Sequence, residues 1–151
     1  MRKRTKRKVW PLVNPVAMAI EGACISTNDA LDQLRVRELA SIDNLTKGCA
    51  TEVDYYNIKA LIGICRAMAS AGIGPEALEA CKRASEYQMQ DFMRFGLTKR
   101  MATTGPGLQA YRDVFEYHDL QRQSVARSEY EKHIQAEIRR VRFTKEYSDA
   151  V

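Results

Sequence analysis

The chain has 151 residues, of which 45% are hydrophobic and 28% are charged. These values are typical of one globular domain of ordinary size, and they exclude a disordered chain, a collagen-like repeat and a small scaffold that depends on disulfides. The formal net charge is +5, from 24 Lys and Arg against 19 Asp and Glu.

Positive charge is concentrated at the two ends of the sequence. The N-terminal cluster comprises Arg2, Lys3, Arg4, Lys6, Arg7 and Lys8, and the C-terminal cluster comprises Arg139, Arg140, Arg142 and Lys145. Removing the six N-terminal cations leaves 18 basic residues against 19 acidic ones, so the body carries no excess of positive charge. Because like charges repel, we predict a disordered basic tail over residues 1–9. We expect both clusters to bind nucleic acid or an acidic partner, without reading sequence.

Apolar spacing and capping residues predict helices in most of the chain. Asn14 and Pro15 are typical of a helix start and predict a short helix over residues 14–23. A second helix is predicted from residue 26 or 27 to Lys47 and Gly48, and its apolar side comprises Leu31, Leu34, Leu39, Ile42 and Leu45.

A third helix is predicted to begin after Thr51 and to form the buried centre of the domain. Between residues 58 and 71 the strongly polar side chains are Lys59, Arg66 and Ser70, and their offsets of 7 and 4 place them on one stripe. Gly63 lies on that stripe and predicts the close approach of a neighbouring element.

The sequence Gly-Ile-Gly-Pro at residues 72–75 is the clearest break in the chain. A fourth helix is predicted from Pro75 to about Phe95, ended by Gly96, with an apolar set of Leu78, Cys81, Ala84 or Ser85, Met89 and Phe92. After a stiff turn at residues 105–107, a fifth helix is predicted to carry on one side Leu108, Tyr111, Phe115 and His118.

The last predicted helix begins near the capping box formed by Ser128 and Glu131. Its apolar seam is narrow and its other faces are charged, so the helix projects or packs against a partner through Tyr130, Ile134, Ile138 and Val141. No useful strand alternation occurs. We therefore predict an all-α fold, a single compact helical domain of five to six helices over residues 10–143, with a C-terminal tail over residues 144–151.

No catalytic signature is present. His118 lies beside Asp119 in sequence, but adjacent residues of a helix point about 100° apart, so we interpret His118 as a partly buried histidine with a satisfied hydrogen bond. No short Cys-x-x-Cys spacing occurs, which predicts no metal site, no cofactor and four buried free thiols, Cys24, Cys49, Cys65 and Cys81. No apolar run spans a membrane, and prolines interrupt the N-terminal one, so we expect a cytoplasmic protein.

The region 87–101 is rich in methionine and aromatic residues. We interpret Met68, Met89, Met93 and Met101 as core residues, together with Phe92 and Phe95. Exposure of several of them would instead mark a surface for a partner.

From residue 10 to about 142, the chain resembles a family of small proteins of about 150 residues from proteobacterial prophages and mobile islands, some of which are labelled Fis-like regulators. The resemblance is carried by residues 30–39 (ALDQLRVREL), 72–78 (GIGPEAL), 104–110 (TGPGLQA), 116–124 (EYHDLQRQS) and 127–131 (RSEYE). It implies a phage or mobile-element origin and no catalytic residue. A helix-turn-helix places a basic helix after its turn, whereas here the helix after residues 72–75 begins with Glu76 and Glu79.

We therefore expect a non-enzymatic protein that binds a host protein or ribonucleoprotein complex, such as an inhibitor of a nucleic-acid-based defence like CRISPR. The alternative is a DNA-binding transcriptional regulator that uses the basic tail and the cluster at residues 139–145. An enzyme with a dispersed active site ranks third. The apolar seam of the last helix also predicts self-association into a homodimer.

Overall fold

The computed structural model describes the backbone of residues 29–149 and the side chains of residues 31–142. Within this range every regular element is a helix, which confirms the predicted all-α single domain. The elements are α2 (Asp29–Lys47), α3 (Glu52–Ser70), α4 (Ala77–Thr98), α5 (Gly105–Ser124) and α6 (Arg127–Asp149). The predicted basic tail, the predicted helix over residues 14–23 and Cys24 lie outside the described residues.

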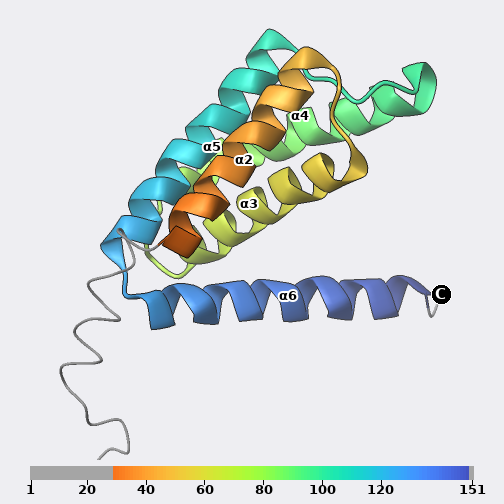
Figure 1. Cartoon of the computed structure of the whole chain (residues 1–151). Helices are drawn as coiled ribbons and strands as arrows, with labels where there is room; N and C mark the ends of the chain where they lie inside the picture. Colours follow the sequence, from red (N-terminus) through yellow and green to blue (C-terminus); the bar gives the residue numbers. More distant parts are fainter. Residues whose placement is uncertain (1–28, 150–151) are drawn as a thin grey trace, which may run out of the picture.

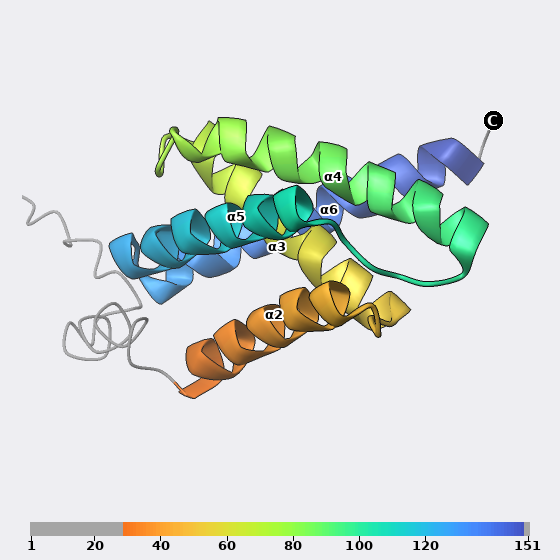
Figure 2. The same ribbon diagram turned by 90° about the horizontal axis from the view of Figure 1, so that it is seen from above.

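α3 is the central helix because it packs against all four others. α2, α4 and α5 form a bundle with it, whereas α6 runs along one side of the bundle and packs mainly on α3 (Figures 1 and 2). The sequence of α3 explains its position. Ile58, Cys65 and Met68 are fully buried, while Lys59 and Arg66 lie on the predicted polar stripe and are exposed.

The junction between α2 and α3 is held by one carboxylate. Asp54 accepts hydrogen bonds from the Thr51 backbone N–H at 2.8 Å and the Ser41 hydroxyl at 2.9 Å, and from the Asn44 amide at 3.3 Å. Burial raises the pKa of Asp54, but these bonds outweigh burial and lower it. The bond to Thr51 is half of a capping box that starts α3 as predicted.

The predicted apolar face of α4 is confirmed at Cys81 and Ala84 and is wrong at its larger side chains. Leu78, Met89 and Phe92 are exposed, and apart from Cys81 the buried positions are small or polar: Ala77, Ala80, Ala84, Gln88 and Asp91. Small side chains allow neighbouring helices to approach closely. The two buried polar side chains are hydrogen-bonded. The Gln88 amide donates to the Tyr55 carbonyl at 3.3 Å, and the Asp91 carboxylate accepts a bond from the Tyr111 hydroxyl.

The end of α4 and the cap of α6 differ from their predictions. α4 continues through Gly96 to Thr98 and ends at Lys99, which adopts the left-handed conformation with φ of 57°. α6 begins at Arg127, so Ser128 lies inside the helix and Glu131 pairs with Arg127 at 3.0 Å instead of completing a capping box. α6 extends to Asp149, beyond the predicted domain end at residue 143.

The three described cysteines are free thiols, as predicted, but not all of them are buried. Cys65 and Cys81 lie in the core, whereas Cys49 is exposed. Cys49 follows Gly48, whose φ of 69° marks the turn that ends α2, and the turn places the next side chain at the surface. Among the helices described, none is both long enough and apolar enough to span a bilayer.

Candidate binding groove

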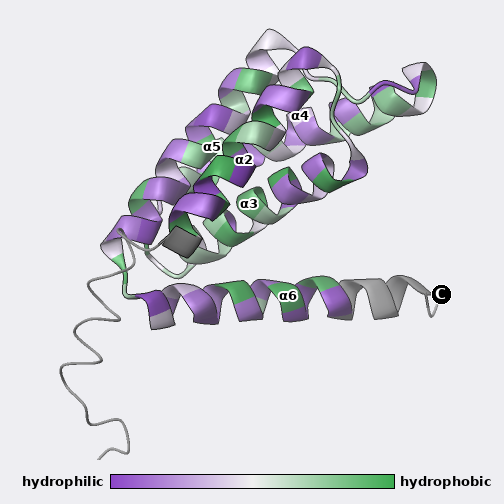
Figure 3. Ribbon diagram, viewed as in Figure 1, coloured by the Kyte–Doolittle hydropathy of each residue, from purple (hydrophilic) through white to green (hydrophobic). Residues whose placement is uncertain are grey.

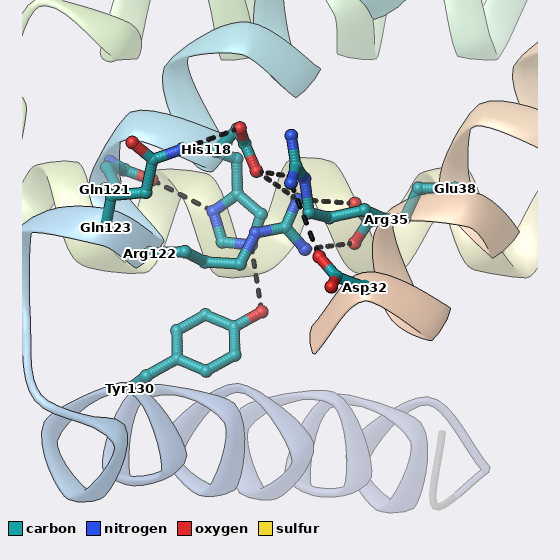
Figure 4. Close-up of polar contacts among 9 residues, drawn as sticks. Asp32, Arg35, Glu38, His118, Gln121, Arg122, Gln123 and Tyr130 are labelled. Atoms are coloured by element: carbon teal, nitrogen blue, oxygen red, sulfur yellow. Dashed lines mark hydrogen bonds and ion pairs between the residues drawn. The ribbon is translucent and has the colours of Figure 1, made fainter. Parts of the chain in front are cut away.

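His118 is fully buried, and both of its ring nitrogens are hydrogen-bonded (Figure 4). The Gln121 amide nitrogen donates to the carbonyls of Cys65 at 3.1 Å and Ile73 at 2.8 Å, which leaves its oxygen to accept a bond from His118 Nδ1 at 3.0 Å. With the proton on Nδ1, Nε2 accepts the Tyr130 hydroxyl at 3.1 Å. This chain of bonds ties the start of α6 to α5 and α3.

The pKa shifts show that His118 is a neutral core residue. Burial lowers the pKa of His118 to about 3, helped by the charge of Arg122, and burial raises the pKa of Tyr130 to about 12. The neutral imidazole has no nitrogen left for a substrate, and Asp119 pairs with Arg35 at 2.8 Å rather than with His118. The predicted hydrogen bonding of His118 is confirmed, and the ring is fully rather than partly buried.

A buried ion pair lies beside His118. Arg122 donates two hydrogen bonds to Glu38, at 2.7 and 3.1 Å, and stacks 5.8 Å from the centre of the Phe115 ring. Burial raises the pKa of Glu38 against the opposing effect of Arg122, and the bond to Glu38 raises the pKa of Arg122 although burial alone lowers it. Sequence reasoning missed this pair and placed Leu39 inside, whereas Leu39 is exposed.

The apolar seam of α6 is buried near the start of the helix and exposed in its second half. Tyr130 is buried with Met68, and Ile134 is partly buried against the same cluster. Further along the same seam, Ile138 is 39% exposed and Val141 is 44% exposed. The seam therefore changes from a packed contact to an open one along its length. The corresponding apolar turns interrupt the otherwise hydrophilic ribbon of α6 in Figure 3.

A groove of about 570 Å³ opens between α3 and this part of α6, and we call it the α3–α6 groove. Ser85 and Gln88 of α4 complete its lining, and Arg66 donates to the Ser85 hydroxyl at 2.6 Å. The apolar lining of the groove comprises Tyr56, Ala60, Ile62, Gly63, Ile64, Ile134, Ile138 and Val141. Gly63 forms the close contact that the sequence predicted, because a Cβ atom at this position would overlap the Glu137 carboxylate.

Cations surround the apolar lining of the α3–α6 groove. Lys59 and Arg66 come from α3, and Arg140 and Arg142 come from α6. The single carboxylate of the lining, Glu137, accepts two bonds from Arg140, at 2.7 and 2.9 Å, and these bonds lower its pKa. Four cations and one carboxylate give the lining a formal charge of +3.

A second apolar surface lies on α4 next to the groove. This α4 patch consists of Met89, Phe92, Met93 and Leu97, whose exposed fractions range from 55% to 87%. The centre of the Phe92 ring lies 5.7 Å from the centre of the Tyr55 ring. The Tyr55 ring centre in turn lies 5.6 Å from that of Tyr56, which lines the groove. The interpretation as core residues is therefore wrong for Met89, Phe92 and Met93. Met68 and Met101 are buried as predicted, and Phe95 is partly buried against the core.

The described basic residues of α6 that the sequence predicted as binding residues lie on two different faces of the helix. Arg140 and Arg142 line the α3–α6 groove, whereas Arg139 lies on another face of α6 and donates to the Gln135 carbonyl at 3.3 Å. The six cations of the tail and the side chain of Lys145 lie outside the described part. Lys59 and Arg66 were not predicted as binding residues, but their stripe on α3 is the sequence signal that identifies them.

Over residues 31–142, no cluster of three metal-ligating side chains occurs. In the comparisons with known proteins, no family model, no curated protein and no solved structure matches this chain.

Proposed function

We propose that the protein is a non-enzymatic binding protein and that the α3–α6 groove is its contact surface for a macromolecular partner. One observation carries the proposal: an apolar groove that is open along α6 is lined by cations from two helices. Apolar surface rimmed by polar groups is typical of interaction sites, because water leaves it at little cost when a partner binds. His118, the side chain best suited to catalysis by type, is committed to hydrogen bonds in the core.

The partner that we propose is a host protein or ribonucleoprotein complex. Inhibition of a nucleic-acid-based defence is one specific role of this kind, and the family resemblance contributes only the mobile-element setting. Four cations and one carboxylate line the groove, and such a lining also attracts the carboxylates of an acidic protein surface. The apolar floor of the groove supports the same choice, since phosphates gain nothing from contact with Ile138 and Val141.

Site-specific photocrosslinking tests this proposal in cells that contain the partner. A photoreactive amino acid replaces Ile138 in the groove or, as a control, Leu120 on α5, which is 62% exposed and outside the groove. A discrete protein adduct from position 138 and none from position 120 is expected. Adducts of equal yield from both positions, or adducts from position 120 alone, would refute the groove as the contact surface.

A DNA-binding regulator is the second candidate, favoured by the meeting of Lys59 and Arg66 with the predicted cations Arg140 and Arg142. On duplex DNA each phosphate contact contributes about −0.9 to the slope of log K against log salt. Replacing both Arg140 and Arg142 with alanine should then reduce the magnitude of the slope by about 1–2. An unchanged slope removes the groove cations from this candidate.

A further inference from the structure

We propose that the occupant of the α3–α6 groove is an amphipathic helix of a partner protein, with carboxylates flanking its apolar face. This inference rests on the proposed function and specifies the chemistry of the partner. Its basis is the combination of an open helical seam and a cationic lining on the same groove.

The dimensions of the groove fit about two helical turns. Its lining on α6 runs from Ile134 to Arg142, which at 1.5 Å per residue spans about 12 Å. The seam positions in the groove lining, Ile134, Ile138 and Val141, are separated by 4 and 3 residues, the spacing through which one helix contacts another. A helix lying in the groove would cover the part of this seam that α3 leaves open.

The charges specify what flanks the apolar face of that helix. Lys59 and Arg66 are seven residues apart, so they project from the same side of α3 about two turns from each other. Carboxylates seven residues apart on the incoming helix match this separation. Arg142 contributes a cation from α6.

The same charges disfavour the other occupants. A second copy of α6 would bring Arg140 and Arg142 against an identical pair, and the N-terminal segment of the chain carries six cations of its own. Duplex DNA would satisfy the cations but leave its phosphates against the isoleucine and valine side chains. A small amphipathic anion would pair with one cation and cover only part of the apolar lining.

Fluorescence anisotropy with the full chain tests the inference with three peptides of about 21 residues at about 0.15 M salt. The first peptide is a helix with Leu along one face and Glu on both flanks. The second replaces every Glu with Lys, and the third has the composition of the first in scrambled order. We expect the Lys and scrambled peptides to bind at least about tenfold more weakly than the Glu peptide. Equal binding of the Glu and Lys peptides, or no binding of the Glu peptide, overturns the inference.

Charge reversal separates recognition from damage to the fold. The double variant Lys59→Glu/Arg66→Glu should bind the Glu peptide about tenfold more weakly and gain affinity for the Lys peptide. The matched control Arg37→Glu/Arg112→Glu makes the same change in net charge at exposed positions outside the groove, on α2 and α5. Equal effects of the two double variants would contradict recognition at the groove, because they would reflect net charge alone.

Competition identifies the occupant and separates the two proposals. Displacement of the Glu peptide by dodecanoate or duplex DNA at lower concentrations than unlabelled Glu peptide assigns the groove to that competitor and overturns the helical occupant. If position 138 crosslinks to a partner in cells but the Glu peptide does not bind, the inference fails and the proposed function stands. If the peptide binds but position 138 yields no adduct, the proposed function fails.

Discussion

Acidification is expected to destabilise this fold through His118. In the folded chain the pKa of His118 is about 3, mainly because burial disfavours the imidazolium, whereas an exposed imidazole in the unfolded chain has a pKa of about 6.5. The folded-state value is the lower one, so the unfolded state binds the extra proton between these two values. The stability that His118 contributes is therefore present above about pH 6.5 and is lost as the pH falls toward about 3.

The magnitude follows from this difference in pKa. At about 1.4 kcal/mol per unit, the full difference corresponds to about 5 kcal/mol, and about 2.5 kcal/mol of it is lost between about pH 7 and pH 4.5. Because ordinary domains are stable by only about 5–15 kcal/mol, this loss is large enough to measure.

Urea unfolding at several pH values in this range, followed by circular dichroism, measures the effect. His118→Gln is the matched variant, because an amide can still donate to the Gln121 oxygen and accept from Tyr130 but does not titrate. Glu38 and Asp54 titrate in both proteins, so the difference between the two pH profiles isolates His118. Wild type should lose about 2.5 kcal/mol more than the variant between about pH 7 and 4.5. Parallel profiles would refute the reasoning.

Three further predictions concern the core and the caps. Glu38→Ala leaves the charge of Arg122 buried without its main partner, and urea unfolding should show a loss of about 3–5 kcal/mol; a loss below about 1 kcal/mol would contradict a buried pair. Thr104→Ala removes the hydroxyl that caps α5 at the Gly107 N–H, 3.2 Å away, and should cost about 1 kcal/mol in the same assay. With serine at position 24, a thiol reagent should modify Cys49 in the folded protein and the two buried thiols only after unfolding; three fast thiols would contradict the burial.

Capping residues and breaks predicted the helices well because they act locally. Thr51 and Asp54 start α3, Thr104 caps α5, and the break at residues 72–75 separates α3 from α4. The inward face of α4 could not be predicted in the same way. Spacing favoured the larger side chains Leu78 and Met89, whereas the structure buries alanines together with Gln88 and Asp91. Those polar groups are stabilised inside by Tyr55 and Tyr111, which lie on other helices, and such partners are invisible in a local pattern.

The α3–α6 groove was predictable in its parts but not as a whole. The polar stripe of α3 and the narrow seam of α6 are both evident in the sequence. Counting charges over the body averaged Lys59 and Arg66 with distant acids and gave no excess. Only the packing of α6 on α3 brings these cations beside Arg140 and Arg142, more than seventy residues later in the chain.

α6 is held against the rest of the domain at two points along its axis. Near its start Tyr130 donates a hydrogen bond to His118, and seven residues later the Glu137 carboxylate lies where a Cβ atom on residue 63 would be. At 1.5 Å per residue these points are about 10 Å apart, so α6 cannot tilt about either point alone. The width of the opening is therefore set by the missing side chain at position 63 as well as by the tyrosine hydroxyl.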